Sequence, residues 1–107
     1  MIVTTTPTIE GRPISEYHGI VSGTAIHGIN IGKDFKAIGR NLVGGRSKTY
    51  EDELDQGQSE VMAELEQAAV GLGANAVVGV RLDVEALGNG NMLLVSVVGT
   101  AVTVAES

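Results

Sequence analysis

The sequence predicts one α+β domain over residues 1–107, in which a small β-sheet carries one long helix and one short helix. Three observations lead to this fold class. A long stretch with helical periodicity lies near the middle of the chain, strand-like segments flank it, and the turn sequence Gly88-Asn89-Gly90-Asn91 joins the last two strands. A chain of 107 residues has the size of one domain with a single core.

Two strands are expected before the helical region. Residues 2–6 are β-branched and stop at Pro7, which is typical of a short edge strand. Residues 14–27 are strand-like but contain Gly19 and Gly23. Glycine inside a strand indicates a bulge or the close approach of another backbone, so we expect such features in this strand.

The short helix is expected at residues 33–43. Its apolar side chains Phe35, Ile38 and Leu42 are spaced by three and four residues, as on one face of an amphipathic helix. We expect it to end at Gly44-Gly45, because glycine commonly terminates helices.

The long helix follows directly. Ser47 or Thr49 can cap its N-terminus, the carboxylates at positions 51–53 suit the positive end of the helix dipole, and Gly71 and Gly73 are stop signals. This helix should turn an apolar stripe toward the sheet. The residues expected in the stripe are Leu54, Val61, Met62, Leu65, Ala68, Ala69 and Leu72.

A β-hairpin is expected to close the domain. Its first strand alternates between an apolar set (Val78, Val80, Leu82 and Val84) and a polar set (Gly79, Arg81, Asp83 and Glu85). That alternation predicts one buried face and one polar face. The Asn89-Gly90 pair favours a tight turn, after which residues 92–104 return as the second strand.

The last strand is apolar on both faces. Leu93, Val95, Val97 and Ala101 lie on one face, and Leu94, Val98, Val102 and Val104 lie on the other. Strands buried on both faces have this pattern. Because one helix layer covers only one face of a sheet, we expect another copy of the chain to cover the second face. The mean hydropathy of +0.19 is high for a small domain and agrees with such an interface.

Composition narrows the classes of function. The formal net charge of −6, the scattered basic residues and the absence of Trp argue against binding to nucleic acids or anionic membranes. Without cysteine, the chain can form neither disulfides nor thiolate metal sites. It has no signal-peptide pattern and no apolar run near the roughly 20 residues that span a bilayer, so we expect a cytoplasmic protein.

Five sequence blocks follow one another along almost the whole chain. They are Thr4-Thr5-Thr6-Pro7-Thr8-Ile9-Glu10-Gly11, Glu16-Tyr17-His18-Gly19-Ile20-Val21-Ser22-Gly23, Gly44-Gly45-Arg46-Ser47 with Tyr50-Glu51, Leu72-Gly73-Ala74-Asn75-Ala76-Val77-Val78-Gly79, and Ser96-Val97-Val98-Gly99-Thr100-Ala101-Val102. Together they resemble the YbjQ-like family, small prokaryotic proteins of unknown function that are often labelled heavy-metal-binding. The resemblance implies a compact subunit, related in outline to the dodecin type, that assembles through its sheets into a ring-like homopentamer.

His18 and His27 are the candidate metal ligands. Nine positions apart in one strand, they would lie on opposite faces and roughly 30 Å apart at about 3.3 Å per residue. A bulge would return them to one face without closing the distance, so only a site shared between subunits, with a carboxylate such as Glu16 or Asp34, would use them. The alternative is that both are ordinary surface or interface histidines.

A second candidate site is an anion pocket formed by Gly44, Gly45, Arg46 and Ser47. Backbone N–H groups at the start of a helix, the helix dipole and an arginine would together suit a carboxylate or phosphate. The alternative is that the glycines form a turn, Ser47 caps the helix and Arg46 pairs with an acidic residue.

The pattern predicts no catalytic site. Asp83 and Glu85 would lie about 7 Å apart on one strand face, but no nucleophile, base and orienting group accompany them. Tyr17 and Tyr50 are expected to be packing residues with hydrogen-bonded hydroxyls.

The sequence therefore favours a homo-oligomer, a pentamer according to the resemblance, that binds a heavy-metal ion or a small anion at subunit interfaces. The identity of the cofactor is left open by the sequence, and a divalent metal ion is the candidate. The alternative is a structural oligomer that recruits a protein partner and binds no small ligand.

Overall fold

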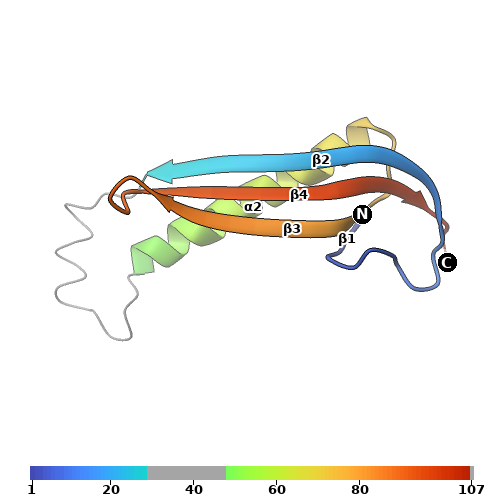
Figure 1. The fold of residues 1–107 in the computed structure, drawn as a ribbon, viewed down its shortest axis with the longest axis horizontal. Coiled ribbons are helices and arrows are strands. Elements are labelled where there is room, and N and C mark those ends of the chain that lie inside the picture. Colours follow the sequence, from blue (N-terminus) through green and yellow to red (C-terminus); the bar gives the residue numbers. More distant parts are fainter. Residues whose placement is uncertain (29–47, 107) are drawn as a thin grey trace.

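The computed structural model describes residues 1–28 and 48–106, which form a four-stranded mixed sheet with one helix along one face (Figure 1). The elements are β1 (Ile2–Val3), β2 (Ile14–Gly28), α2 (Lys48–Gly71), β3 (Ala76–Leu87) and β4 (Met92–Val104). The strand order is β1-β3-β4-β2, with β1 parallel to β3 and the other neighbours antiparallel. The α+β class is confirmed, while the helix expected at 33–43 lies outside the described residues.

β2 shows both of the glycine features expected in it. The register with β4 shifts between Tyr17 and Gly19, where Gly19 has a φ of +125°, so this position is a bulge. Gly23 is instead a point of close approach, because a Cβ there would overlap the carbonyl oxygen of Val61 on α2. Beyond the bulge, alternate residues are covered by α2, so Ile20 is exposed while Val21 is buried.

α2 contacts the sheet along a line of residues spaced by four, namely Gly57, Val61, Leu65 and Ala69. This line lies over β2 and β4, with few contacts to β3. Gly73, with a φ of +85°, donates to the carbonyl of Val70 and confirms the expected stop. No helix in the described part of the chain combines the length and apolar character needed to cross a membrane.

The expected apolar stripe and N-terminal cap of α2 differ from the structure. Ala68 is exposed, and Leu72 lies beyond the helix and is largely exposed. Thr49 lies within the helix and does not cap it, and Ser47 is outside the described residues. The buried Gly57 was not expected in the stripe, because periodicity counts only side chains with apolar bulk.

The β3–β4 hairpin is present, and Leu87 pairs with Met92 next to the turn. The expected single buried face of β3 was wrong, because a bulge between Val78 and Arg81 places Val78 and Val80 in different apolar clusters. The N–H groups of Gly79 and Val80 at this bulge donate to the carbonyls of Thr6 and Thr4, at 2.8 and 3.0 Å. The N-terminal segment thus covers this part of the β3 edge.

Leu82 and Val84 were also expected to be buried, but they are 38% and 42% exposed. Their partners Val97 and Val95 lie under α2, so these two residues are on the helix side of the sheet. They remain exposed because α2 lies over β2 and β4 and leaves the far half of β3 uncovered.

The sheet has an apolar cluster on each face. The cluster under α2 contains Val21, Val61, Leu65, Ala69, Ala74, Val77, Val80, Val95, Val97 and Ala101. The second contains Ala76, Val78, Val102 and Val104, against which Ile2, Ile9 and Ile14 pack. Residues near the N-terminus therefore cover one end of the face that was expected to need a second copy.

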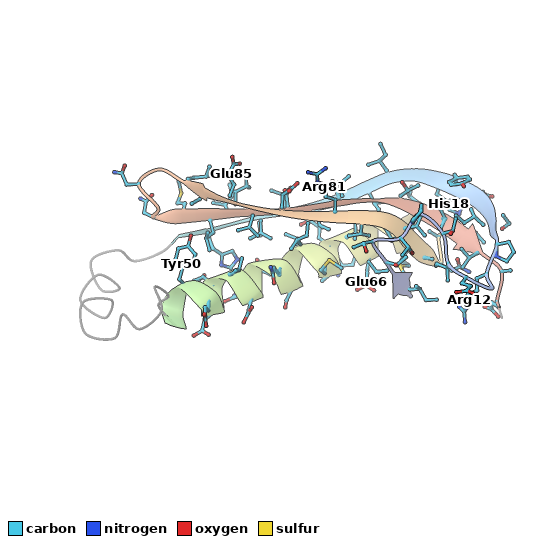
Figure 2. The ribbon with its side chains drawn as sticks, turned by 60° about the horizontal axis from the view of Figure 1, so that its bottom comes forward. Arg12, His18, Tyr50, Glu66, Arg81 and Glu85 are labelled. Carbon is cyan, nitrogen blue, oxygen red and sulfur yellow. The ribbon has the colours of Figure 1, made fainter. Side chains whose placement is uncertain are left out.

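The rest of that face is open. We call it the open face and define its apolar patch as Ile20, Ile26, Met92 and Val98, which are 78%, 61%, 37% and 40% exposed. Figure 2 shows Arg81 and Glu85 pointing away from α2 on the same face. The polar residues Ser22, Thr24 and Ser96 lie between the apolar ones by strand register.

Candidate functional site

The main polar cluster of the described residues lies where β2 ends beneath α2. His27 has the same parity on β2 as Val21 and Gly23, so its ring is directed toward the helix. Its Nδ1 lies 2.6 Å from Oε2 of Glu53, and its Nε2 lies 2.8 Å from Oε2 of Glu60. One imidazole is thus held between two carboxylates of α2.

Helix geometry explains why two carboxylates reach the same ring. Glu53 and Glu60 are seven residues apart, which is close to two turns, so both project from one side of α2. Gly57 lies between them, where a Cβ would be 2.9 Å from Cγ2 of Val95 and 3.7 Å from Cδ2 of His27. The missing side chain lets the helix approach β4 and leaves room for the imidazole.

The charges of the cluster favour a protonated His27. An ionised carboxylate only accepts hydrogen bonds, so contacts at both ring nitrogens require both to carry a proton. The neighbouring Glu60 and Glu53 carboxylates raise the pKa of His27 above its ordinary value, against a smaller opposing effect of burial. The hydrogen bond from His27 in turn lowers the pKa of Glu60.

Exposure within the cluster increases toward Glu60. The side chains of His27, Glu53 and Glu60 are 12%, 30% and 47% exposed. Gln56 donates from Nε2 to the other oxygen of Glu60 at 3.3 Å, one helical turn away. The His27–Glu60 contact is therefore the side of the cluster that solvent or another molecule reaches first.

His18 lies in different surroundings at the other end of β2. Its Nε2 is 2.7 Å from the Thr103 hydroxyl, and its Nδ1 is 3.5 Å from Oε2 of Glu16, whose side chain is 60% exposed. Figure 2 shows it near Arg12, at the end of the sheet far from Tyr50 at the start of α2. The structure therefore does not bring His18 and His27 together.

The described residues of one subunit do not form a complete metal site. Within residues 1–28 and 48–106, no three His, Asp or Glu side chains are placed so that they could hold one ion. The two carboxylates at His27 meet opposite edges of its ring, so they do not converge on a common point. His27 Nε2 and Glu60 together supply two metal ligands, whereas a tetrahedral metal site needs four.

Two further groups of residues were considered in the sequence, the charged residues of β3 and the anion pocket. Arg81 and Asp83 form an exposed ion pair at 3.7 Å on the open face, which is the solvated arrangement that contributes little stability. The proposed anion pocket at Gly44, Gly45, Arg46 and Ser47 lies outside the described residues.

Comparison with known proteins identifies the family. Residues 1–105 match the model of the YbjQ-like family, which is described as "putative heavy-metal-binding". A UPF0145 protein of Clostridium botulinum (strain Alaska E43 / Type E3) is 55% identical over 103 residues, covering 95% of this chain and 97% of the relative. The chain belongs to the YbjQ-like family.

A solved structure shows that the YbjQ-like fold extends to distant sequences. The crystal structure of a protein of unknown function from the DUF74 family of Pediococcus pentosaceus ATCC 25745 matches this chain with a TM-score of 0.64. Each chain is covered to 98%, at 18% sequence identity. At this identity the match supports the YbjQ-like fold and carries nothing about function.

Of the three residues in the cluster of this YbjQ-like chain, only His27 was expected from the sequence to take part in a site. His27 was a candidate because of its residue type, whereas Glu53 was expected only to suit the helix dipole and Glu60 was not singled out. The signal was present: two glutamates seven residues apart flank Gly57, and His27 has the strand parity of Val21. The spacing of these residues predicts the cluster only if α2 is known to cross the end of β2, and the sequence pattern does not predict that crossing.

Proposed function

We propose that this protein functions as a homo-oligomer, assembled through the open face of its sheet, that holds a metal ion or small anion at subunit boundaries. The exposed apolar patch carries the proposal. Burial of apolar surface is the main favourable term in protein association, so large apolar side chains that are exposed in one subunit favour an interface. Ile20 and Ile26 are 78% and 61% exposed in one subunit, so a partner surface would cover them.

The patch has the mixed character of a subunit interface. The residues between its apolar members are small and polar, and Arg81 and Asp83 already form an ion pair with each other on β3. Covering the ion pair would carry a desolvation cost, which burial of the apolar members of the patch would have to offset. The ring-like pentamer implied by the family resemblance is the form of assembly that this proposal favours.

A measurement of subunit number tests the proposal. Native mass spectrometry and light scattering of the full chain should give a multiple of the subunit mass. The Ile20→Thr/Ile26→Thr double variant keeps β-branched residues in the strand and should shift the mass toward the monomer. Val70→Thr, at a residue 63% exposed on α2, is the control and should leave the mass unchanged. A monomeric wild type, or a double variant of unchanged mass, would contradict assembly through the open face.

A structural oligomer that recruits a protein partner is the second candidate function. It is favoured by the lack of a converging set of three metal-binding side chains among residues 1–28 and 48–106. It predicts an assembled protein that takes up neither divalent metal ions nor phosphate, which the same native mass spectra would show.

A further inference from the structure

We propose that His27 Nε2 and Glu60 are two ligands of a divalent-metal site at the outer edge of β2, and that Glu53 is the positioning residue that orients the imidazole. The inference rests on the metal-binding part of the proposed function, and the two protein ligands would need further ligand atoms from a neighbouring copy or from water. It assigns the metal function to specific residues and to one class of ion.

The first argument is the arrangement around the imidazole. A histidine that binds a metal through one ring nitrogen usually donates its other N–H to a carboxylate, which fixes the orientation of the ring. Glu53 is placed for this role, 2.6 Å from Nδ1 and less exposed than Glu60. The other nitrogen then faces a second carboxylate at 2.8 Å, where a cation can replace the shared proton.

The second argument is the position of the pair. β2 is the last strand in the sheet order, so β4 is its only neighbour among the described strands. The flank of α2 that carries Glu60 reaches this outer edge, because Glu64 one turn further accepts a hydrogen bond from the backbone N–H of Thr24 at 3.4 Å. Glu60, at 47% exposed, is thus accessible at the edge of the sheet, where water or another molecule can supply the remaining ligand atoms.

The third argument concerns the class of metal. The chain contains no cysteine, so it cannot offer the thiolates that soft heavy-metal ions prefer. Imidazole nitrogen with carboxylate oxygen suits ions of intermediate character such as Zn²⁺ and Ni²⁺. The residues at His27 therefore fit a zinc-like ion and do not fit a thiophilic one.

Zinc titration followed by native mass spectrometry tests the inference. The variants are His27→Gln, Glu60→Gln and Glu53→Gln. His18→Gln is the matched control on the same strand. Wild type and His18→Gln should take up Zn²⁺ in a fixed ratio to subunits. His27→Gln and Glu60→Gln should lose this uptake at sub-millimolar zinc. Glu53→Gln should retain the ratio with a Kd about 10–100-fold higher, as expected when an orienting carboxylate is removed.

Circular dichroism of each variant shows whether it is folded, and the subunit count comes from the same spectra. An oligomer that takes up no Zn²⁺, or that takes it up equally in folded His27→Gln, would overturn the metal site and leave the oligomer standing. A wild-type monomer that binds zinc through His27 and Glu60 would instead overturn the oligomer and keep the ligand assignment. Loss of uptake in His18→Gln would show that the other histidine is the ligand.

Discussion

The two faces of the sheet differ sharply along the same strands. Ile20 and Val21 are consecutive residues of β2, yet the first is 78% exposed and the second 5%. On the covered face, Gly23 and Gly57 let α2 lie close to the strands, and the ring of His27 is fixed between two helix carboxylates. The open face has no such glycines beneath a helix, and its patch is exposed. Small residues that permit close approach therefore accompany the face that α2 covers, whereas polar residues separate the apolar ones on the open face.

The largest loss of stability is expected from a cavity under α2. Leu65 is completely buried in the cluster on the covered face. Leu65→Ala should lower the free energy of unfolding by about 2–5 kcal/mol, because apolar contacts are lost and a void remains. Val70→Ala, on the exposed side of α2, should change it by less than about 0.5 kcal/mol. Urea unfolding followed by circular dichroism measures both, and equal effects would show that α2 does not pack as described.

A smaller loss is expected from adding one methyl group at Gly23. The new Cβ would overlap the carbonyl oxygen of Val61, so α2 would have to move away from β2. We expect Gly23→Ala to cost about 1–3 kcal/mol, as overpacking does. Gly28→Ala is the matched control, because a Cβ there meets nothing within 4 Å. A neutral Gly23→Ala variant would mean that close approach does not hold the helix on this face.

The contribution of the His27 cluster to the stability of the fold should depend on pH. Since the folded state raises the pKa of His27, this stability is fully present below the unfolded pKa of about 6.5 and is lost as the pH rises through the folded pKa. Since the folded state lowers the pKa of Glu60, stability is also lost as the pH falls through that folded pKa.

Thermal unfolding of the metal-free protein between pH 5 and 9 checks this prediction. The difference in Tm between wild type and His27→Gln should be largest in the mildly acidic range, at about pH 5–6.5, and should shrink toward pH 9. A difference that stays constant with pH would show that His27 contributes through packing alone. His18→Gln provides the comparison for loss of a histidine elsewhere on β2.

The smallest effect on subunit stability is expected on the open face. Ile20→Thr and Ile26→Thr remove apolar groups that are already largely exposed in one subunit, so each should change the unfolding free energy of an isolated subunit by less than about 0.5 kcal/mol. Comparing unfolding midpoints at low and high protein concentration separates this from assembly. The wild-type midpoint should rise with concentration if copies associate, and the double variant should lose that dependence.

Local patterns predicted much of the fold. β2, α2 and the β3–β4 hairpin were expected from periodicity, glycine stops and the Asn89-Gly90 turn, because each signal lies within the segment that it describes. The bulge between Val78 and Arg81 was not expected, since alternation of residues looks regular across it. The burial of Val102 and Val104 by Ile9 and Ile14 was also missed, because it depends on contacts between the two ends of the chain.

The candidate site was less predictable than the fold for the same reason. His27 was selected by residue type, but its partners come from a helix whose position over β2 is set by glycines at contact points. Once that position is known, the spacing of Glu53 and Glu60 explains the cluster directly. His18 is the same residue type on the same strand, but it contacts a hydroxyl and one exposed carboxylate. Residue type alone therefore does not distinguish the two histidines.

The pairing of β2 with β4 also has a consequence for how the protein is made. Ile14, the first residue of β2, pairs with Val104, the last residue of β4. During synthesis, β2 is made before α2 and β3, and its partner strand β4 is made only after both. α2 and the β3–β4 hairpin rely on nearer neighbours and can form first, whereas pairing between distant segments is slow. Until β4 is made, β2 has no strand to pair with, and unpaired strand edges expose an incomplete chain to misassembly.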